Sequence, residues 1–322
     1  MTDATYATVI DAVFAMNAYQ HNPDDGSWSN NLAAFFPNLY AGQLGDYSLE
    51  AVSLADENTN NNFLAIAYRS SAGQTIISYR GTSSLLGSDF FNGDIYNGYG
   101  VGAGSPYGND ARDAVTFYQE VADLLDDPWQ GATDITVVGH SLGGGLAGFV
   151  GAIYGLKGVL FDNMTFNNAA SSAYSDSLPS RNIGDPADQI DLPADAAFSK
   201  EFYGTQTPYP NNLSDLSAYA VTGELLSVIL PARFFQTPPV QYLDSNGGPR
   251  GILALHSMSL LTLLLYADVE QDTAWQSIGV SFINALYNNS LGAAVGGTDA
   301  SGTSFTAGQM STIIAYSALN SG

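Results

Sequence analysis

The strongest indication of the fold of this chain is the sequence Ile135-Thr136-Val137-Val138-Gly139-His140-Ser141-Leu142-Gly143-Gly144. A run of β-branched residues comes first, then the pattern Gly-x-Ser-x-Gly, then a segment rich in small residues. Apolar side chains recur at helical spacing in that last segment, at Leu142, Leu146, Phe149 and Val150. The stretch therefore predicts a strand, a sharp turn and a helix, which is the order that a nucleophile elbow requires.

At a nucleophile elbow the serine lies in a strained turn, which only flanking residues without bulky side chains allow. The turn holds the hydroxyl clear of the backbone and places the next backbone N–H where an oxyanion would develop. Ser141 is therefore the candidate nucleophile, and the N–H of Leu142 is a candidate oxyanion donor. The alternative is a glycine-rich structural turn, because Gly-x-Ser-x-Gly also occurs in proteins that have no catalytic serine.

The composition indicates a large, acidic, globular protein. The 322 residues are 45% hydrophobic and 12% aromatic, which is enough for an extensive core. A formal net charge of -23 should repel nucleic acid and anionic membrane surfaces, so we expect no nucleic-acid partner. The chain has no cysteine, which excludes disulfides, thiol catalysis and thiolate metal ligands.

Neither a signal peptide nor a membrane span is indicated. Met1-Thr2-Asp3-Ala4 lacks the basic and apolar regions of a secretory signal. No apolar run reaches the roughly 18 residues of a transmembrane helix, so we predict no transmembrane segment. The abrupt end at 316–322 hints at excision from a larger protein, whose missing C-terminal part could carry a secretion signal. We expect an extracellular protein of bacterial type.

Hydrophobic periodicity predicts a mixed, mostly parallel sheet with helices on both faces. Besides the elbow, we predict helices at 4–19, 111–125 and 274–287, and strands at 47–54, 63–68, 75–79, 164–166 and 216–221. Ser70-Ser71-Ala72-Gly73 favours a hairpin between the second and third runs, and the polar, proline-containing segment 170–212 is expected to leave the sheet. We find no repeat and no second domain, so residues 1–322 are predicted to form a single α/β catalytic domain.

Histidine is the usual base for a serine hydroxyl near neutral pH, and the chain has three: His21, His140 and His256. His140 adjoins the nucleophile, where its side chain should point elsewhere, so we expect a packing or hydrogen-bonding role. His21 lies in a polar loop and is expected to be a solvated surface residue. α/β-hydrolases carry their triad in the order serine, acid, histidine, which His256 alone satisfies. His256 is therefore the candidate base, with a buried structural histidine as the alternative.

The acid should follow a strand and lie between Ser141 and His256. Glu224 stands where a predicted strand meets a glycine turn and is the favoured candidate. Asp244 lies in a turn-like segment shortly before His256 and is the second candidate, whereas Asp215 is at the wrong end of its strand. The aspartates of the polar segment are expected to be solvated, with calcium binding as a weak alternative; they are Asp185, Asp188, Asp191 and Asp195. We predict no cofactor and leave any metal site open.

A second oxyanion donor should come from a loop that follows an earlier strand. The predicted strand at 75–79 is followed by Arg80-Gly81-Thr82, so Thr82 can offer its backbone N–H and its hydroxyl. An ordinary strand-end turn is the alternative. Arg80 is one of only eight basic residues and is expected to anchor a structural ion pair rather than act in catalysis.

Taken together, these motifs resemble those of the class 3 lipases, the fungal-type triacylglycerol lipase and phospholipase A1 branch of the α/β-hydrolases. The resemblance rests on Tyr79-Arg80-Gly81-Thr82, on Val138-Gly139-His140-Ser141-Leu142-Gly143-Gly144, and on the order and setting of His256. It implies an α/β-hydrolase fold, Ser141 and His256 as nucleophile and base, and Thr82 and Leu142 as the oxyanion hole. The acid departs from the family pattern, because members usually carry an aspartate in an Asp-Pro-Val-Pro-like stretch where this chain has Gly223-Glu224-Leu225-Leu226.

The leading interpretation is a serine carboxylic-ester hydrolase that acts on lipid esters through an acyl-enzyme. Two apolar segments, 84–91 and 225–235, could serve as a mobile lid or instead belong to the core. An apolar lid would permit transient contact with a neutral lipid interface despite the negative charge. The alternatives are a noncatalytic binding or surface module that keeps the hydrolase fold, a small-ester esterase, and a peptidase.

Overall fold

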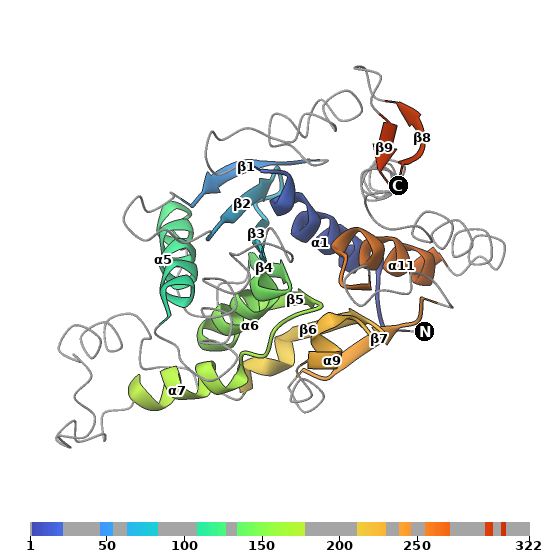
Figure 1. The fold of residues 1–322 in the computed structure, drawn as a ribbon. Coiled ribbons are helices and arrows are strands. Elements are labelled where there is room, and N and C mark those ends of the chain that lie inside the picture. Colours follow the sequence, from blue (N-terminus) through green and yellow to red (C-terminus); the bar gives the residue numbers. More distant parts are fainter. Residues whose placement is uncertain are drawn as a thin grey trace.

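A seven-stranded sheet is the centre of the structure (Figure 1). The computed structural model describes residues 2–21, 46–53, 63–82, 108–126, 134–177, 211–229, 238–245, 255–270, 294–298 and 304–306. The strands lie in chain order across the sheet: β1 (Tyr47–Val52), β2 (Ala65–Ser70), β3 (Thr75–Tyr79), β4 (Ile135–His140), β5 (Lys157–Phe161), β6 (Leu216–Val221) and β7 (Val240–Leu243). A separate two-stranded sheet pairs β8 (Ala294–Thr298) with β9 (Ser304–Thr306).

The sheet is antiparallel at one end and parallel over the rest. β1, β2 and β3 pair antiparallel, and β3 to β7 pair parallel. The predicted hairpin between β2 and β3 is confirmed: Gly73 takes a φ of 92° in its turn, a conformation that favours glycine. Because β4 is central and parallel to its neighbours, its carboxyl end lies beside the carboxyl ends of β3 and β5.

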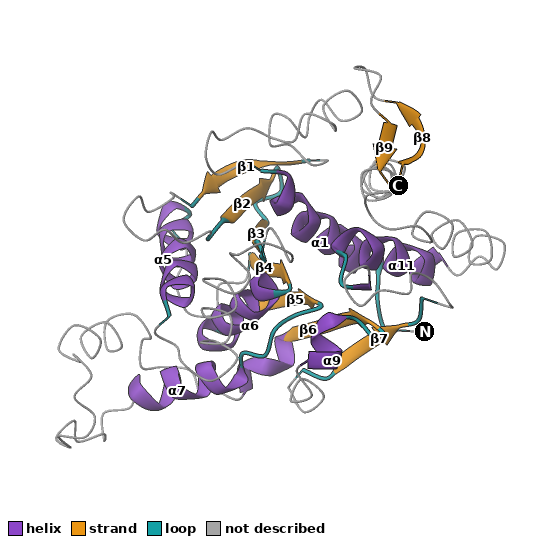
Figure 2. Cartoon of the chain, viewed as in Figure 1, coloured by secondary structure: helices purple, strands orange, loops and turns teal. Residues whose placement is uncertain are grey.

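Helices cover both faces of the sheet, as Figure 2 shows. One group packs on one face: α5 (Asn109–Leu124), α6 (Leu142–Tyr154) and α7 (Asn167–Ser177). The other face carries α1 (Tyr6–Asn17), which runs into the short helix η1 (Ala18–Gln20), and α11 (Met258–Glu270). The short helices η4 (Asn211–Asp215) and α9 (Leu225–Ile229) flank β6 in sequence. A mostly parallel sheet between two helical layers, with an elbow after its central strand, is the α/β-hydrolase fold.

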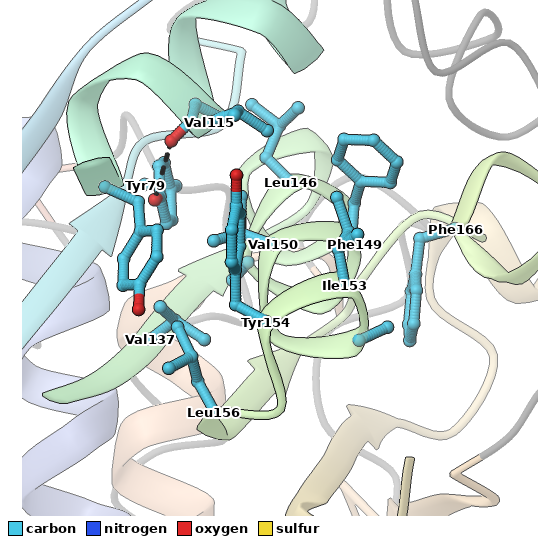
Figure 3. Close-up of a cluster of buried hydrophobic side chains, with 14 of the residues drawn as sticks. Tyr79, Val115, Val137, Leu146, Phe149, Val150, Ile153, Tyr154, Leu156 and Phe166 are labelled. Atoms are coloured by element: carbon cyan, nitrogen blue, oxygen red, sulfur yellow. Dashed lines mark hydrogen bonds between the residues drawn. The ribbon is translucent and has the colours of Figure 1, made fainter. Parts of the chain in front are cut away.

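Each face of the sheet has its own hydrophobic core, because successive side chains of a strand point to opposite sides. From β4, Val137 packs with Tyr79 and the apolar side of α6, the cluster drawn in Figure 3, whereas Val138 packs with α1 and α11. The buried hydroxyl of Tyr79 donates to the carbonyl of Ala114 in α5 at 3.0 Å. Both helical layers are therefore fixed to the strand that carries the elbow.

One predicted strand needs correction. The strand after the elbow helix is β5, not 164–166, which is a loop. The helix α6 ends at Tyr154, and Gly155 follows it in the left-handed conformation. β5 then pairs with β4 as far as Phe161, and the next residue, Asp162, takes a φ of 39°. The segment expected to leave the sheet from 170 begins with the helix α7, which is not part of the sheet, and 178–210 lies outside the described residues. The predicted helix at 274–287 and the possible lid at 84–91 lie outside the described residues.

None of the helices that the structure describes is both long enough and apolar enough to cross a membrane.

Candidate active site

Ser141 occupies a strained turn between β4 and α6. Its φ of 59° and ψ of -123° lie in a region that residues with a side chain rarely adopt. Backbone hydrogen bonds hold the turn: the Ser141 amide donates to the Phe161 carbonyl at 2.9 Å, and the Met164 amide donates to the Ser141 carbonyl at 2.9 Å. The end of β5 and the loop that follows it therefore hold the backbone on both sides of the Ser141 side chain.

The glycines of Gly-x-Ser-x-Gly are explained by close backbone contacts. A Cβ on Gly139 would collide with the backbone of Gly143, and a Cβ on Gly143 would collide with the Tyr79 carbonyl. Small residues at these positions allow β4, the turn and the start of α6 to lie against the end of β3.

His256 and Glu224 complete a chain of hydrogen bonds with Ser141. Nε2 of His256 lies 2.9 Å from Oγ of Ser141, and Nδ1 lies 2.7 Å from Oε2 of Glu224. With the carboxylate accepting the Nδ1 proton, Nε2 is left to accept the proton of the serine hydroxyl. All three side chains are buried, so these contacts are shielded from water. The structure thus brings together the three residues that the sequence singled out, from the ends of β4 and β6 and the turn before α11.

Glu224 is held on both of its oxygens. Oε1 accepts hydrogen bonds from the amide and the hydroxyl of Ser227, at 2.7 and 2.6 Å, and Oε2 accepts from the Leu226 amide at 2.7 Å. These donors belong to the first turn of α9, which places a carboxylate at unsatisfied helix amides. Asp244, the second candidate, is exposed, and the Nδ1 of His256 is already engaged by Glu224.

The two expected oxyanion donors belong to segments that pass close to Ser141. Leu142 is the first residue of α6, where a backbone N–H has no partner inside its own helix. Thr82 directly follows Gly81, and a Cβ placed on Gly81 would lie 3.1 Å from the Cβ of Ser141. The strand end that carries Thr82 therefore passes close to the serine, and Thr82 itself is partly buried.

The two remaining histidines, His140 and His21, are both buried. His140 is buried and hydrogen-bonds through Nδ1 to the Tyr19 hydroxyl at 2.8 Å, which agrees with the expected packing or hydrogen-bonding role. His21, expected on the surface, is only 7% exposed. It directly follows η1, and the preceding helix α1 is covered by α11, so the end of this segment is buried rather than solvated.

Asp162 is a neighbour of the site that the sequence did not reveal. It follows β5, is fully buried, and lies with Oδ2 at 3.6 Å from Nε2 of His140. His140, Asp162 and His256 have ligating atoms within 4.8 Å of one another. Because His256 already bonds to Ser141 and Glu224, we treat this group as part of the candidate active site and assign no metal to it. The aspartates between 185 and 195 lie outside the described residues.

The sheet and the elbow define the class of this protein as an α/β-hydrolase. A sequence comparison narrows the class, because residues 10–241 match the model of a phospholipase-like family, the Tle-like phospholipase domain. The chain belongs to this family. The matched segment contains Ser141 and Glu224 and ends before His256.

Solved structures add distant similarities. A lipase from Rhizopus microsporus var. chinensis is 15% identical with a TM-score of 0.31, over 51% of this chain and only 59% of its own length. A mutant form of MDLA from Penicillium cyclopium is 13% identical with a TM-score of 0.36, over 76% of this chain and 81% of its own. Similarity at this level says nothing about activity. No curated protein matches the sequence.

Proposed function

We propose that this protein is a serine carboxylic-ester hydrolase that acts on lipid esters through an acyl-enzyme, in the manner of the class 3 triacylglycerol lipases and phospholipases A1. The observation that carries the proposal is the chain of hydrogen bonds from Ser141 through His256 to Glu224 at a strained elbow. Membership of a phospholipase-like family supports a lipid ester as the substrate.

In the acylation step Ser141 Oγ attacks the ester carbonyl carbon while Nε2 of His256 takes the hydroxyl proton. Glu224 keeps the imidazole in the required tautomer and stabilises the imidazolium that forms. The N–H groups of Leu142 and Thr82 stabilise the oxyanion of the tetrahedral intermediate. His256 then gives its proton to the leaving alcohol, and the acyl group stays on Ser141.

In the deacylation step the same groups act on water. Nε2 of His256 takes a proton from the water that attacks the acyl carbonyl, and returns it to Ser141 Oγ as the fatty acid leaves. The strained backbone of Ser141 holds its oxygen in place for both attacks, so it need not be oriented anew in each turnover.

A fluorophosphonate probe tests the nucleophile directly. We expect covalent labelling of the folded wild-type protein at Ser141, no labelling of Ser141→Ala, and unchanged labelling of the control Ser48→Ala on the exposed edge strand β1. Absence of label on Ser141 in folded protein would show that the site is not a working serine hydrolase. It would favour the noncatalytic module.

A substrate series tests the class. Purified protein is assayed with a short soluble ester, a triglyceride emulsion, neutral phosphatidylcholine vesicles and a peptide amide. We expect fatty acid release from the emulsion or the vesicles, and release from the first ester position of phosphatidylcholine would assign a phospholipase A1. Turnover of the soluble ester alone would indicate an esterase, and turnover of the peptide alone would indicate a peptidase.

A further inference from the structure

Beside His256 lies a second pair of a histidine and a carboxylate, which the proposed mechanism does not use. The ring centroids of His140 and His256 are 4.8 Å apart, with an interplanar angle of 40°. On the edge of His140, Nε2 lies 3.6 Å from Oδ2 of Asp162. His140 and Asp162 are as deeply buried as the three residues of the hydrogen-bonded chain.

Asp162 is anchored to β6 through both its backbone and its carboxylate. Its backbone N–H donates to the Tyr219 carbonyl at 2.8 Å, and its Oδ1 accepts from the Val221 amide at 3.1 Å. The Val221 carbonyl in turn accepts from the Glu224 amide at 3.2 Å. Asp162 therefore ties the end of β5 to the end of β6, directly before the turn that carries Glu224.

His140 is oriented from its other side. The Tyr19 hydroxyl, from η1, lies 2.8 Å from Nδ1 of His140, and the two rings meet edge to face. This contact fixes the imidazole plane and turns Nε2 toward Asp162. Among the residues that the structure describes, three titratable groups thus face the base at His256: Glu224 from the end of β6, Asp162 from the end of β5 and His140 from the end of β4.

We infer that Asp162 is a positioning residue for His256, acting through its negative charge and through its hold on β6. The inference rests on the proposed function, in which His256 becomes an imidazolium during each step. One carboxylate oxygen of Asp162 and one ring nitrogen of His256 are within 4.8 Å of each other in a water-excluded site. At this separation a buried carboxylate stabilises the imidazolium appreciably. The other oxygen keeps the Val221 amide, and with it the Glu224 turn, in place.

Two substitutions separate these contributions. Asp162→Asn keeps the size and an oxygen for the Val221 amide but removes the charge, whereas Asp162→Ala removes both. We expect about tenfold lower kcat/KM for Asp162→Asn, and an acid limb of the pH–rate profile that moves to lower pH by about half to one unit. Asp162→Ala should lose about 100-fold and also unfold at a lower temperature.

Asp126→Asn is the matched control, because Asp126 also has a positive φ but is exposed after α5, away from the carboxyl ends of the strands. It should keep the wild-type rate and profile. His140→Gln removes the neighbouring ring but leaves the charge of Asp162. The acid limb of the pH–rate profile of this variant should therefore not move to lower pH. If Asp162→Asn fails to fold, an acid limb that moves down in His140→Gln overturns the inference.

The rate of fluorophosphonate labelling, followed against pH, measures activation of Ser141 without any lipid substrate. The role of Asp162 is overturned, and the proposed function is left intact, if the wild type is active and Asp162→Asn has a normal rate with an unshifted acid limb of the pH–rate profile. A wild type that neither labels nor hydrolyses esters would instead overturn the proposed function.

Discussion

Replacing Glu224 with glutamine tests whether Glu224 is the acid that orients His256. The test is sharp because each carboxylate oxygen of Glu224 accepts two hydrogen bonds. Oε1 faces the amide and hydroxyl of Ser227, and Oε2 faces the Leu226 amide and Nδ1 of His256. A glutamine amide offers one oxygen and one NH2 group. Whichever way it turns, the NH2 group meets a backbone N–H, and the negative charge beside His256 is lost.

The expected effects follow from these contacts. A buried donor left without an acceptor costs about 1 to 3 kcal/mol, so the variant should be less stable by that amount. If the NH2 group faces His256, Nδ1 must become the acceptor and Nε2 carries the proton, which is the wrong tautomer for a base. In serine proteases the equivalent change lowers kcat by about 10⁴, and we expect a loss of about 10³ to 10⁴ here, or about 4 to 5.5 kcal/mol.

The assay is steady-state hydrolysis of a soluble ester, with urea unfolding to measure stability. Asp244→Asn is the matched control, since it neutralises an exposed carboxylate close in sequence to His256 and should leave kcat nearly unchanged. A folded Glu224→Gln variant with less than about a tenfold loss in kcat would refute the reasoning. Near-normal activity there, with a large loss in Asp244→Asn, would move the acid to Asp244.

Three further outcomes are expected. Ser227→Ala removes the hydroxyl from Glu224 Oε1 but keeps the amide, so kcat should fall about three- to tenfold with KM unchanged; an altered KM alone would speak against an orienting role. Gly81→Ala would place a Cβ against the His140 carbonyl oxygen, so we expect either no soluble expression or an activity that is lower by about 100-fold. Normal kinetics of this variant would contradict this packing. Burial raises the pKa of Asp11 to about 7, so ionisation above the unfolded pKa lowers the free energy of unfolding progressively as the pH rises from about 4 to 7. Asp11→Asn should therefore stabilise the protein by about 1 to 2 kcal/mol at pH 8 and not at pH 4, and equal effects in urea unfolding at both pH values would be the contrary result.

The local parts of the fold could be predicted because their signals are short-range. The elbow follows from residues 135–144, where the glycines, the β-branched run and the helical spacing agree, and the hairpin follows from the turn at 70–73. The strand predicted at 164–166 was wrong. Met164-Thr165-Phe166 has the apolar character of a strand, but it is Lys157–Phe161 that pairs with β4. Strand propensity does not distinguish two neighbouring segments of this kind, because pairing with the rest of the sheet determines which of them forms the strand.

The sequence alone singles out the candidate nucleophile and the candidate base, because Ser141 lies in a motif that is complete within a few residues and His256 is the one histidine that follows it in the chain. The groups that surround these two residues depend on how the strands and helices pack. The sequence favours Glu224 over Asp244 only through its position after a predicted strand, and it is the packing of α11 and the end of β6 that brings Glu224, not Asp244, to His256. Asp162 carries no local signal, because its partners come from two other segments of the chain, the ends of β4 and β6. Contacts between the carboxyl ends of parallel strands depend on the order and register of those strands, which no stretch of sequence contains.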